Sequence, residues 1–186
     1  QLVSRYGPET IRAYIDELKE RSERQMRSYL AEIPDGTYEF EDYLDNDGIS
    51  NDPLRVALRM TVEGDSVHFD FSDSSPMTRG PFNVVQAVTI SATYIAIKHI
   101  FTDVHINAGF FKPIRFTLPP TCFLNAQPPA SCSAYTETSQ RVIDVVFGAL
   151  GKALPERLFG APFSTISVIT IAGRTPRGAT TSPICT

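Results

Sequence analysis

YTETSQRVIDVVFGALGKALPERL, residues 135–158, is the segment around which the rest of the chain is organised. It opens with polar residues at 136–141 and continues into a helical pattern that is apolar nearly all round. The apolar positions are Val142, Ile143, Val145, Val146, Phe147, Ala149 and Leu150. A helix with this pattern is a buried helix. Polar side chains at its N-terminus would lie beside free backbone N–H groups and the positive end of the helix dipole, where an anion or a carboxylate is favoured.

Three segments before this helix alternate apolar and polar residues, as strands of a sheet with one buried face do. They cover residues 38–41, 54–62 and 67–71, and a turn at 63–65 joins the second to the third. The sequence therefore predicts three antiparallel strands. Further strand-like runs follow at 114–118, 122–126 and 166–171. We predict an α+β fold in which antiparallel strands, a meander plus later strands, pack on long helices.

A long amphipathic helix is predicted from Gly7 onward. Pro8 is tolerated in its first turn because the missing N–H has no helical partner there. Its inner stripe consists of Ile11, Ile15, Leu18, Ser22, Met26 and Tyr29. Three i,i+4 pairs, Glu17/Arg21, Glu20/Arg24 and Glu23/Arg27, have the favourable orientation. A solvated surface is the simplest interpretation of this charged face, and a docking face for a partner is the alternative.

A second long helix is predicted over residues 84–101. The uncharged apolar run at 84–97 is shorter than the ~20 residues of a membrane span, so we expect a buried core helix. Asn83, with Gln86 three residues later, forms an approximate capping box. Arg79 lies in the polar loop before this helix start, so the loop could hold an anion; an ordinary capped helix entry is the alternative.

The composition is that of a globular chain with one substantial core: 186 residues, of which 42% are hydrophobic and 20% charged. The net charge of -4 and the lack of a Lys/Arg cluster argue against a nucleic-acid groove. Its three cysteines form no CxxC, and an odd number without a signal peptide indicates a reduced, cytoplasmic chain. The sequence starts at Gln1 and ends in a loop-like run, so we expect residues 1–186 to form a single fragment of a larger domain.

Three local features have competing interpretations. Residues 42–48 are rich in Asp and Asn, but they lack the ligand spacing and terminal Glu of an EF-hand, which favours a turn over a calcium site. His68 lies on the polar face of a strand, where a solvated or salt-linked histidine is favoured over a catalytic one. Cys132 has no histidine near it in sequence, which favours a small buried thiol over a nucleophile.

Glu137 is the strongest candidate for chemistry. A carboxylate at a buried helix entry can have its pKa shifted by its surroundings, so Glu137 could act as a general base or anchor a cationic group. Support of the helix N-terminus is the alternative. Thr138 does not complete a capping box, because Arg141 stands where Glu or Gln is required. Capping therefore explains these polar residues only in part.

Five motifs cover most of the chain. They are GTYEFEDYLDNDG (36–48), DFSDSSPMTRGPFN (70–83), INAGFFKPI (106–114), LNAQPPA (124–130) and ETSQRVIDVVFGALGKALP (137–155). In this order they resemble the B-type subunit of the hydantoinase and 5-oxoprolinase family. The most specific part is ETSQR at 137–141, followed by Asp144 and by FGAL at 147–150.

The resemblance implies part of an ATP-dependent enzyme that opens a cyclic amide such as 5-oxoproline or a hydantoin. An A-type partner resembling actin-like kinases would bind ATP and Mg²⁺ and phosphorylate the amide oxygen, and the B-type component would take part in opening the activated ring. We expect Glu137 and Gln140 to be catalytic. The expected substrate-binding residues are Thr138, Ser139, Arg141, Arg79 and Asn83.

The resemblance also implies what these residues do not hold. The family carries a His- and Asp-bearing metal-binding segment upstream of the matched region and a glycine-rich region downstream, and neither is in this sequence. We therefore assign no metal ligand and no bound cofactor here, and expect a divalent metal in the upstream segment. The expected partners are a small cyclic amide and the A-type subunit, in an oligomer without nucleic acid or membrane.

Two other functions remain open. Relatives in the same superfamily carboxylate acetone or acetophenone, so the chain could belong to the alpha-type subunit of such a carboxylase; fold does not choose between these chemistries. The chain could also be a non-catalytic core and subunit-interface scaffold, because it shows no self-contained set of nucleophile, base and metal ligands.

Overall fold

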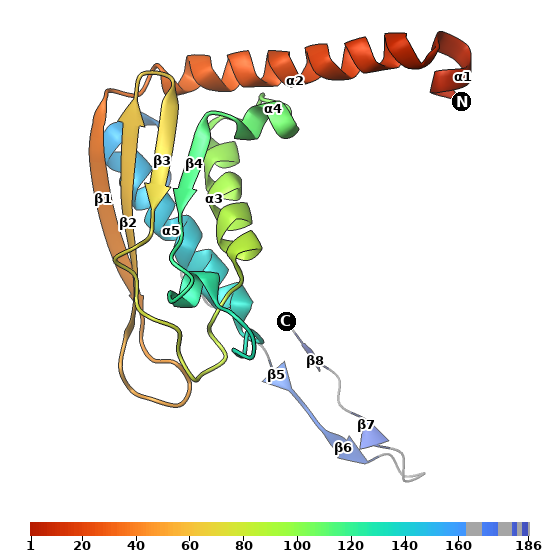
Figure 1. Ribbon diagram of the computed structural model, residues 1–186. Helices are drawn as coiled ribbons and strands as arrows, with labels where there is room; N and C mark the ends of the chain where they lie inside the picture. Colours follow the sequence, from red (N-terminus) through yellow and green to blue (C-terminus); the bar gives the residue numbers. More distant parts are fainter. Residues whose placement is uncertain (163–168, 175–179, 182–183, 186) are drawn as a thin grey trace.

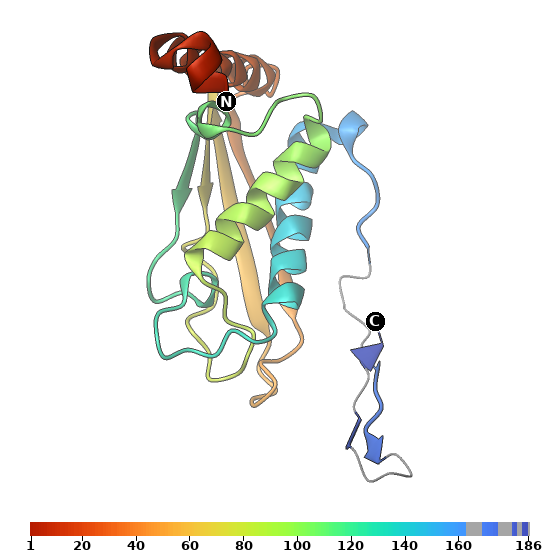
Figure 2. The ribbon, with the colours of Figure 1, turned by 90° about the vertical axis from the view of Figure 1, so that its right-hand side faces the viewer.

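The computed structural model describes residues 1–162, 169–174, 180–181 and 184–185. Its body is a four-stranded sheet with two helices, α3 (Gln86–Ile100) and α5 (Tyr135–Ala153), on one face (Figure 2). Helix α2 (Pro8–Leu30) crosses one end of the sheet, and its first half extends beyond the body together with α1 (Leu2–Tyr6) (Figure 1). The α+β fold predicted from the sequence is confirmed.

The sheet has the order β1-β2-β3-β4. Its strands are β1 (Gly36–Leu44), β2 (Leu54–Glu63), β3 (Ser66–Asp70) and β4 (Ile114–Thr117). The three predicted antiparallel strands are present, but β4 pairs in parallel with β3. A parallel neighbour needs a long crossover connection, which α3 and the short helix α4 (Ala108–Phe111) provide here.

The core lies between the sheet and one side of each covering helix. The strands contribute Val56, Leu58, Met60, Val62, Val67 and Phe69, and α5 contributes Val142, Val145, Val146, Ala149 and Leu150. Each fully buried side chain of this kind contributes about 1.5–3 kcal/mol to stability. The prediction of a buried helix after residue 141 is therefore confirmed.

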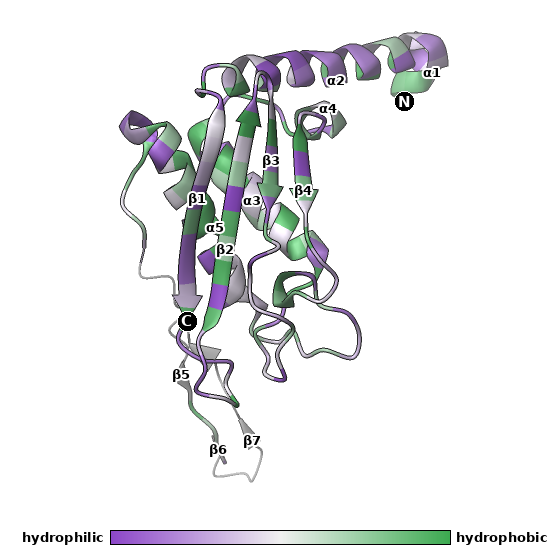
Figure 3. Cartoon of the chain, turned by 60° about the vertical axis from the view of Figure 1, so that its left-hand side comes forward, coloured by the Kyte–Doolittle hydropathy of each residue, from purple (hydrophilic) through white to green (hydrophobic). Residues whose placement is uncertain are grey.

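The opposite face of the sheet is polar (Figure 3). On it, Arg59 forms ion pairs with Glu39 at 2.8 Å and with Asp73 at 3.1 Å. His68 is half-buried, and its Nε2 lies 2.8 Å from the Thr117 hydroxyl on β4. His68 is thus held by a hydrogen bond to the neighbouring strand rather than by an ion pair.

Helix α2 begins at Pro8, as predicted, but only its second half is packed. Ser22, Met26 and Leu30 are buried, whereas Ile15 and Leu18 are 45% and 56% exposed. The ion pairs Glu20–Arg24 and Glu23–Arg27 form, at 3.5 and 3.0 Å. The predicted pair of Glu17 with Arg21 is replaced by one with Arg24 at 2.9 Å, because that guanidinium reaches both carboxylates.

Helix α3 corrects two expectations. It begins at Gln86 with Val85 as its N-cap, and the Asn83 side chain does not cap it. Only one side of the helix is buried, with Thr89, Ala92, Thr93, Ala96 and Ile97 inside, while Ile95 is 46% exposed. The apolar run is therefore a half-buried helix. Among the described residues, no helix is long and apolar enough to cross a membrane.

The strand predicted at 122–126 is instead a 3-10 turn, η1 (Phe123–Asn125). The Asn125 side chain donates to the Leu118 carbonyl at 2.7 Å, and the Cys122 N–H donates to the Pro119 carbonyl at 3.1 Å, so the chain curls back on itself. Part of the run at 166–171 lies outside the described residues. Its described part includes β5 (Ile169–Thr170), which pairs with β8 (Ile184–Cys185), and β6 (Gly173–Arg174) pairs with β7 (Thr180–Thr181).

Candidate functional site

The polar residues 136–141 occupy the first two turns of α5, which begins at Tyr135. Ala134 is the N-cap, and no side chain caps the helix. Successive helical residues point about 100° apart, so the polar side chains divide among several directions. Helix capping therefore does not account for them.

Glu137 and Arg141 lie one helical turn apart and line one recess with a volume of about 140 Å³. The other lining residues are Tyr43, Leu44, Asp45, Asn46 and Phe82. They come from the end of β1, the loop after it, and the loop before α3. Segments far apart in sequence thus meet at the N-terminal end of α5, and the recess holds one predicted catalytic residue, Glu137, and one predicted substrate-binding residue, Arg141.

Arg141 is held by an ion pair between its Nη1 and the Oδ2 of Asp42 on β1. Its side chain is 20% exposed, and its Nε is buried without a hydrogen-bond partner in the described part of the chain. Leaving a buried donor unpaired costs about 1–3 kcal/mol. The Asp42 carboxylate on β1 therefore fixes the orientation of the Arg141 guanidinium, and the Arg141 Nε–H donates to no atom of the described residues.

Thr138, Ser139 and Gln140 lie away from this recess. Thr138 is fully buried, and its hydroxyl donates to the Phe82 carbonyl at 2.6 Å. The Ser139 side chain lines a groove shared with α3, and its hydroxyl donates to the Thr136 carbonyl at 2.8 Å. Gln140 is half-buried and makes no side-chain hydrogen bond within residues 1–162. The structure therefore places these three predicted site residues around the helix rather than in one cluster.

Asn83 is fully buried and connects two loops. Its amide nitrogen donates to the carbonyls of Thr78 at 2.9 Å, Gly80 at 2.9 Å and Ser131 at 3.0 Å. Its Oδ1 accepts from the Thr78 N–H at 3.0 Å. All polar atoms of the side chain are thus engaged in holding the loop before α3 against the segment that leads into α5.

Arg79 lies on the loop that Asn83 holds. Its side chain is exposed, forms no ion pair within the described ranges, and does not line the recess with Glu137. The structure brings this loop to the α5 entry but does not bring the Arg79 side chain to Glu137. Its predicted contact with substrate stays a prediction.

Asp47 holds the recess together, and the sequence prediction did not single it out. Its Oδ1 accepts backbone N–H groups of Ile49 and Ser50 at 2.8 and 2.5 Å, and its Oδ2 accepts from the Thr78 hydroxyl and from the Gly80 N–H at 3.3 Å. These hydrogen bonds, that from Thr78 first, lower the pKa of Asp47 to about 2.

The turn predicted at residues 42–48 is confirmed only from residue 45 onward, because residues 42–44 continue β1. Asp47 ties this turn to the loop before α3. The two loops touch so closely that a Cβ on Gly80 would lie 1.6 Å from the Asp47 carbonyl oxygen. The Asp47-Gly48 pair is the one sequence signal of this turn, because glycine accepts the positive φ of 81° found there.

The described residues offer little for metal or thiol chemistry. No group of three or more His, Cys, Asp or Glu side chains in them could hold a metal ion. Cys132 is half-buried, and its Sγ lies 3.7 Å from the Ala130 carbonyl oxygen. Glu137, Arg141 and the exposed Asp45 are the charged groups that line the recess.

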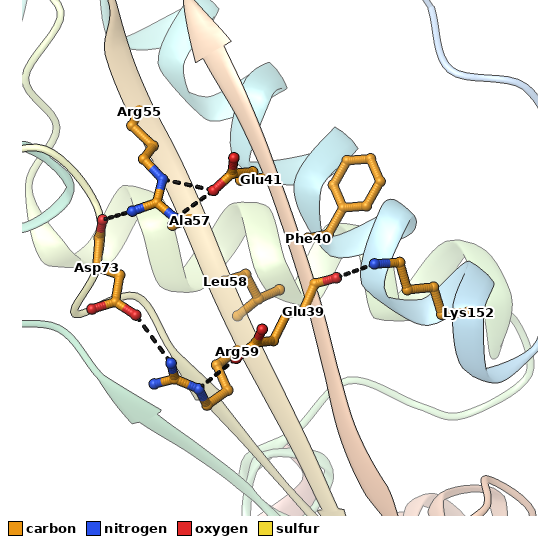
Figure 4. A pocket seen from close by; sticks show the side chains of 9 residues that line it. All are labelled: Glu39, Phe40, Glu41, Arg55, Ala57, Leu58, Arg59, Asp73 and Lys152. Atoms are coloured by element: carbon orange, nitrogen blue, oxygen red, sulfur yellow. Dashed lines mark hydrogen bonds and ion pairs between the residues drawn. The ribbon is translucent and has the colours of Figure 1, made fainter.

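A second recess, of about 450 Å³, lies across β1 and β2 (Figure 4). Five of its charged side chains form ion pairs with one another: Arg55 with Glu41, and Arg59 with Glu39 and Asp73. The sixth, Lys152, donates to the Glu39 backbone carbonyl. The hydrogen bond from Arg55 lowers the pKa of Glu41. Because these charges neutralise one another, this recess is a weaker candidate for binding a charged substrate than the one at α5.

Curated relatives resemble the chain over most of its length. It is 28% identical over 186 residues to the B component of a putative D-/L-hydantoinase from Pseudomonas sp. (strain NS671), covering 94% of this chain and 31% of the relative. It is 33% identical over 181 residues to the beta component of the caprolactamase of Pseudomonas jessenii, covering 95% and 31%. The chain therefore spans about a third of the length of these relatives.

Solved structures share the fold. The crystal structure of the ATP-dependent caprolactamase from Pseudomonas jessenii superposes with a TM-score of 0.80 at 30% identity, over 95% of this chain and 31% of that one. A nucleotide-free acetone carboxylase superposes with a TM-score of 0.79 at 16% identity, over 98% and 27%, which shows a common fold alone. Residues 1–185 match the family Hydantoinase B/oxoprolinase, and the chain belongs to that family.

Proposed function

We propose that this chain forms part of the B-type component of an ATP-dependent enzyme that opens cyclic amides, and that the recess at the start of α5 is one wall of its substrate site. The observation that carries the proposal is the convergence of Glu137 and Arg141 in that recess, between two loops that Asp47 and Asn83 fix. The names hydantoinase and caprolactamase among the relatives support the substrate class.

The proposed chemistry is proton transfer during ring opening. A partner transfers the terminal phosphoryl group of ATP to the amide oxygen and releases ADP, and water then adds to the activated carbon. The ring C–N bond breaks as the nitrogen takes up a proton, and a second water releases inorganic phosphate from the acyl phosphate that this leaves. The Glu137 carboxylate accepts a proton from the first water, a role in which positioned carboxylates contribute about 10²–10⁴-fold to rate. Gln140 lies outside the recess and has no side-chain partner in the described residues, and in this proposal it would contact the ring from the adjoining side of α5.

Arg141 orients this end of the site. Its ion pair with Asp42 fixes the guanidinium beside the recess, while its Nε is buried. Ser139 and Arg79 would contact substrate from neighbouring surfaces. For Asn83 and Thr138 we propose an indirect contribution to binding, through the loop positions that they hold.

The partner in this proposal is an A-type subunit with an actin-like kinase fold, which holds ATP and Mg²⁺. The subunit names of the bacterial relatives and the ATP dependence of the caprolactamase support it. A divalent metal would be bound by residues other than those described here. We also propose a cytoplasmic location, which the free thiols of Cys122 and Cys132 support.

The substrate class is tested by assaying the full-length B-type protein with its A-type component. We expect ATP-dependent turnover of 5-oxoproline, a hydantoin or a larger lactam. ATP-dependent consumption of acetone or acetophenone with bicarbonate, without lactam turnover, would instead make the chain part of a carboxylase.

A scaffold role is the second candidate, and the buried hydrogen bonds of Asn83 and Thr138 favour it. It is tested by Gln140→Ala, because this side chain has no partner to lose within the described chain. A fall in turnover with unchanged thermal unfolding supports the site, whereas unchanged turnover with lost solubility supports the scaffold.

A further inference from the structure

Within the described chain, Glu137 and Arg141 have the spacing of a helical ion pair but do not form one. They stand four positions apart on α5, with the carboxylate nearer the helix N-terminus, and both line the recess. Side chains at this spacing are neighbours on a helix surface, and an acidic residue followed by a basic one is the favourable order. On α2, Glu23 and Arg27 pair in this way at 3.0 Å. The Glu137 carboxylate, in contrast, has no ion pair or hydrogen bond to any described residue.

Asp42 is the residue that binds the Arg141 guanidinium instead. Its Oδ2 pairs with the Arg141 Nη1 across the contact between β1 and α5. Its Oδ1 accepts the Tyr43 N–H at 2.8 Å, so both oxygens of the carboxylate are occupied. The Asp42 side chain is 38% exposed and that of Arg141 is 20% exposed, so water and salt screen this pair less than a surface pair.

This one ion pair is what holds the Arg141 guanidinium on the β1 side. Its Nε–H is buried and donates to no atom in the described part of the chain, so no second contact fixes the group there. Without the Asp42 charge, the guanidinium would be free to turn to a carboxylate that lines the recess. Glu137 lies one turn back on the same helix, and Asp45 lies on the loop after β1.

The choice of partner matters for the chemistry, because an ion-paired carboxylate is a weaker base. An adjacent cation stabilises the charged form of a carboxylate and so reduces its tendency to take up a proton. The recess has a volume of only about 140 Å³, so a guanidinium beside Glu137 would also occupy space that the attacking water needs.

We propose that Asp42 is a positioning residue of the α5 site, which holds the Arg141 guanidinium away from Glu137 and thereby keeps that carboxylate free to accept a proton. Asp42 does not line the recess itself, so it acts through Arg141. This inference rests on the proposed function, because it requires Glu137 to be the base.

The first test is a crystal structure of the full-length B-type protein with Asp42→Asn. Asparagine keeps the size of the side chain and an oxygen for the Tyr43 N–H, but it loses the charge that attracts Arg141. We expect the guanidinium to lie within about 4 Å of the Glu137 carboxylate. A guanidinium that stays beside residue 42, or that turns to Asp45, would overturn the inference whatever the activity of the enzyme.

The second test is kinetic, with the A-type component and ATP, well below the unfolding midpoint of each variant. Asp42→Asn should lower kcat about tenfold, because Glu137 becomes ion-paired. Adding Arg141→Met removes the guanidinium, so kcat of the double variant should return to within about threefold of wild type. Its KM should stay raised, because the proposed Arg141 contact with substrate is lost. A double variant with kcat as low as that of Asp42→Asn alone would contradict the role of Asp42.

Glu39→Gln is the matched control, because it removes another β1 carboxylate that is paired with an arginine, Arg59, at 2.8 Å. It should leave kcat unchanged. The kinetic outcomes separate the two proposals. If Glu137→Gln keeps the wild-type kcat, the proposed function fails and this inference fails with it; if Glu137→Gln loses activity and Asp42→Asn keeps it, the role of Asp42 alone is overturned.

Discussion

At the residue scale, the α5 entry depends on a few buried polar side chains that have no part in helix capping. Both carboxylate oxygens of Asp47 accept hydrogen bonds, and both polar atoms of the Asn83 side chain are hydrogen-bonded. The two residues lie in loops. Buried polar networks of this kind fix one arrangement when every member is satisfied. The position of Glu137 in its recess therefore depends on residues outside α5.

The Asp47 carboxylate should make stability depend on pH. Its folded-state pKa of about 2 is below the ordinary value of 3.8, so the unfolded chain binds more protons in this range. The contribution is complete above about pH 5, and the free energy of unfolding should fall as the pH drops from about 4 toward 2. Urea unfolding at several pH values measures this dependence.

Asp47→Asn should be less stable than wild type at pH 7 and should lose less stability between pH 4 and 2. Asp45→Asn is the control, because Asp45 is exposed and forms no hydrogen bond within the described residues. If Asp47→Asn kept the wild-type slope, the Thr78 and backbone hydrogen bonds would not be responsible for it.

Asn83→Ala should lower the free energy of unfolding by about 1–3 kcal/mol, because it leaves the buried Gly80 carbonyl without this partner and removes the part-buried hydrogen bonds to Thr78 and Ser131. Asn51→Ala, at an exposed position, should change it by less than about 0.5 kcal/mol. Equal stability of the two variants, measured by chemical unfolding, would contradict the bridging role of Asn83.

The sequence could predict a functional segment at residues 137–141, but it could not predict which of its side chains line the recess. Helical periodicity places Glu137 and Arg141 on one side, whereas the Asp42 partner of Arg141 is 99 positions away and is visible only in the folded chain. Asn83 shows the same limit. Its spacing to Gln86 predicted a helix cap, but its side-chain amide instead donates to the carbonyls of Gly80 and Ser131, which lie in two different loops.

At the element scale, the segments with strong local periodicity were predicted well. Helices α2 and α5 and strands β1, β2 and β3 all follow patterns that a short window contains. The parallel direction of β4 and the place of η1 depend on partners distant in sequence, in η1 through the Phe123 N–H that donates to the Ser75 carbonyl at 3.1 Å. No local pattern could predict these contacts. The exposure of one side of α3 could not be predicted for the same reason, because composition indicates an apolar helix but not which elements cover it.

The contact of α4 with α2 gives a prediction at this scale. Gly109→Ala should separate the two helices, because the added Cβ would meet the Lys19 backbone, which cannot move without bending α2. We expect faster amide hydrogen exchange in α2 from Lys19 to Leu30. Gly160→Ala is the control, since a Cβ there has nothing within 4 Å, and equal exchange in both variants would show that the contact does not hold α2.

At the scale of the whole molecule, the sheet has one packed face, one charged face and an apolar surface at its end. The charged pairs on the open face are half-exposed, and such pairs contribute about 0–1 kcal/mol each, so that face needs no cover. At that end, the exposed side chains on α1, the first half of α2 and the outer side of α3 include large apolar ones, among them Tyr14, Leu18 and Ile95.

Our central proposal is that the α5 entry takes part in opening a cyclic amide, and it rests on the family of the chain and on the position of the recess. The most direct test is kcat for ATP-dependent ring opening by the full-length B-type protein with its A-type component, comparing wild type with Glu137→Gln. The variant keeps the size of the side chain and removes its base, and Glu156→Gln, at an exposed position on η2 (Pro155–Arg157), is the control.

We predict that kcat falls more than about a hundredfold in Glu137→Gln, with an unchanged thermal unfolding midpoint and full activity in the control. A folded Glu137→Gln enzyme with kcat within about threefold of wild type would contradict a catalytic role for the α5 entry.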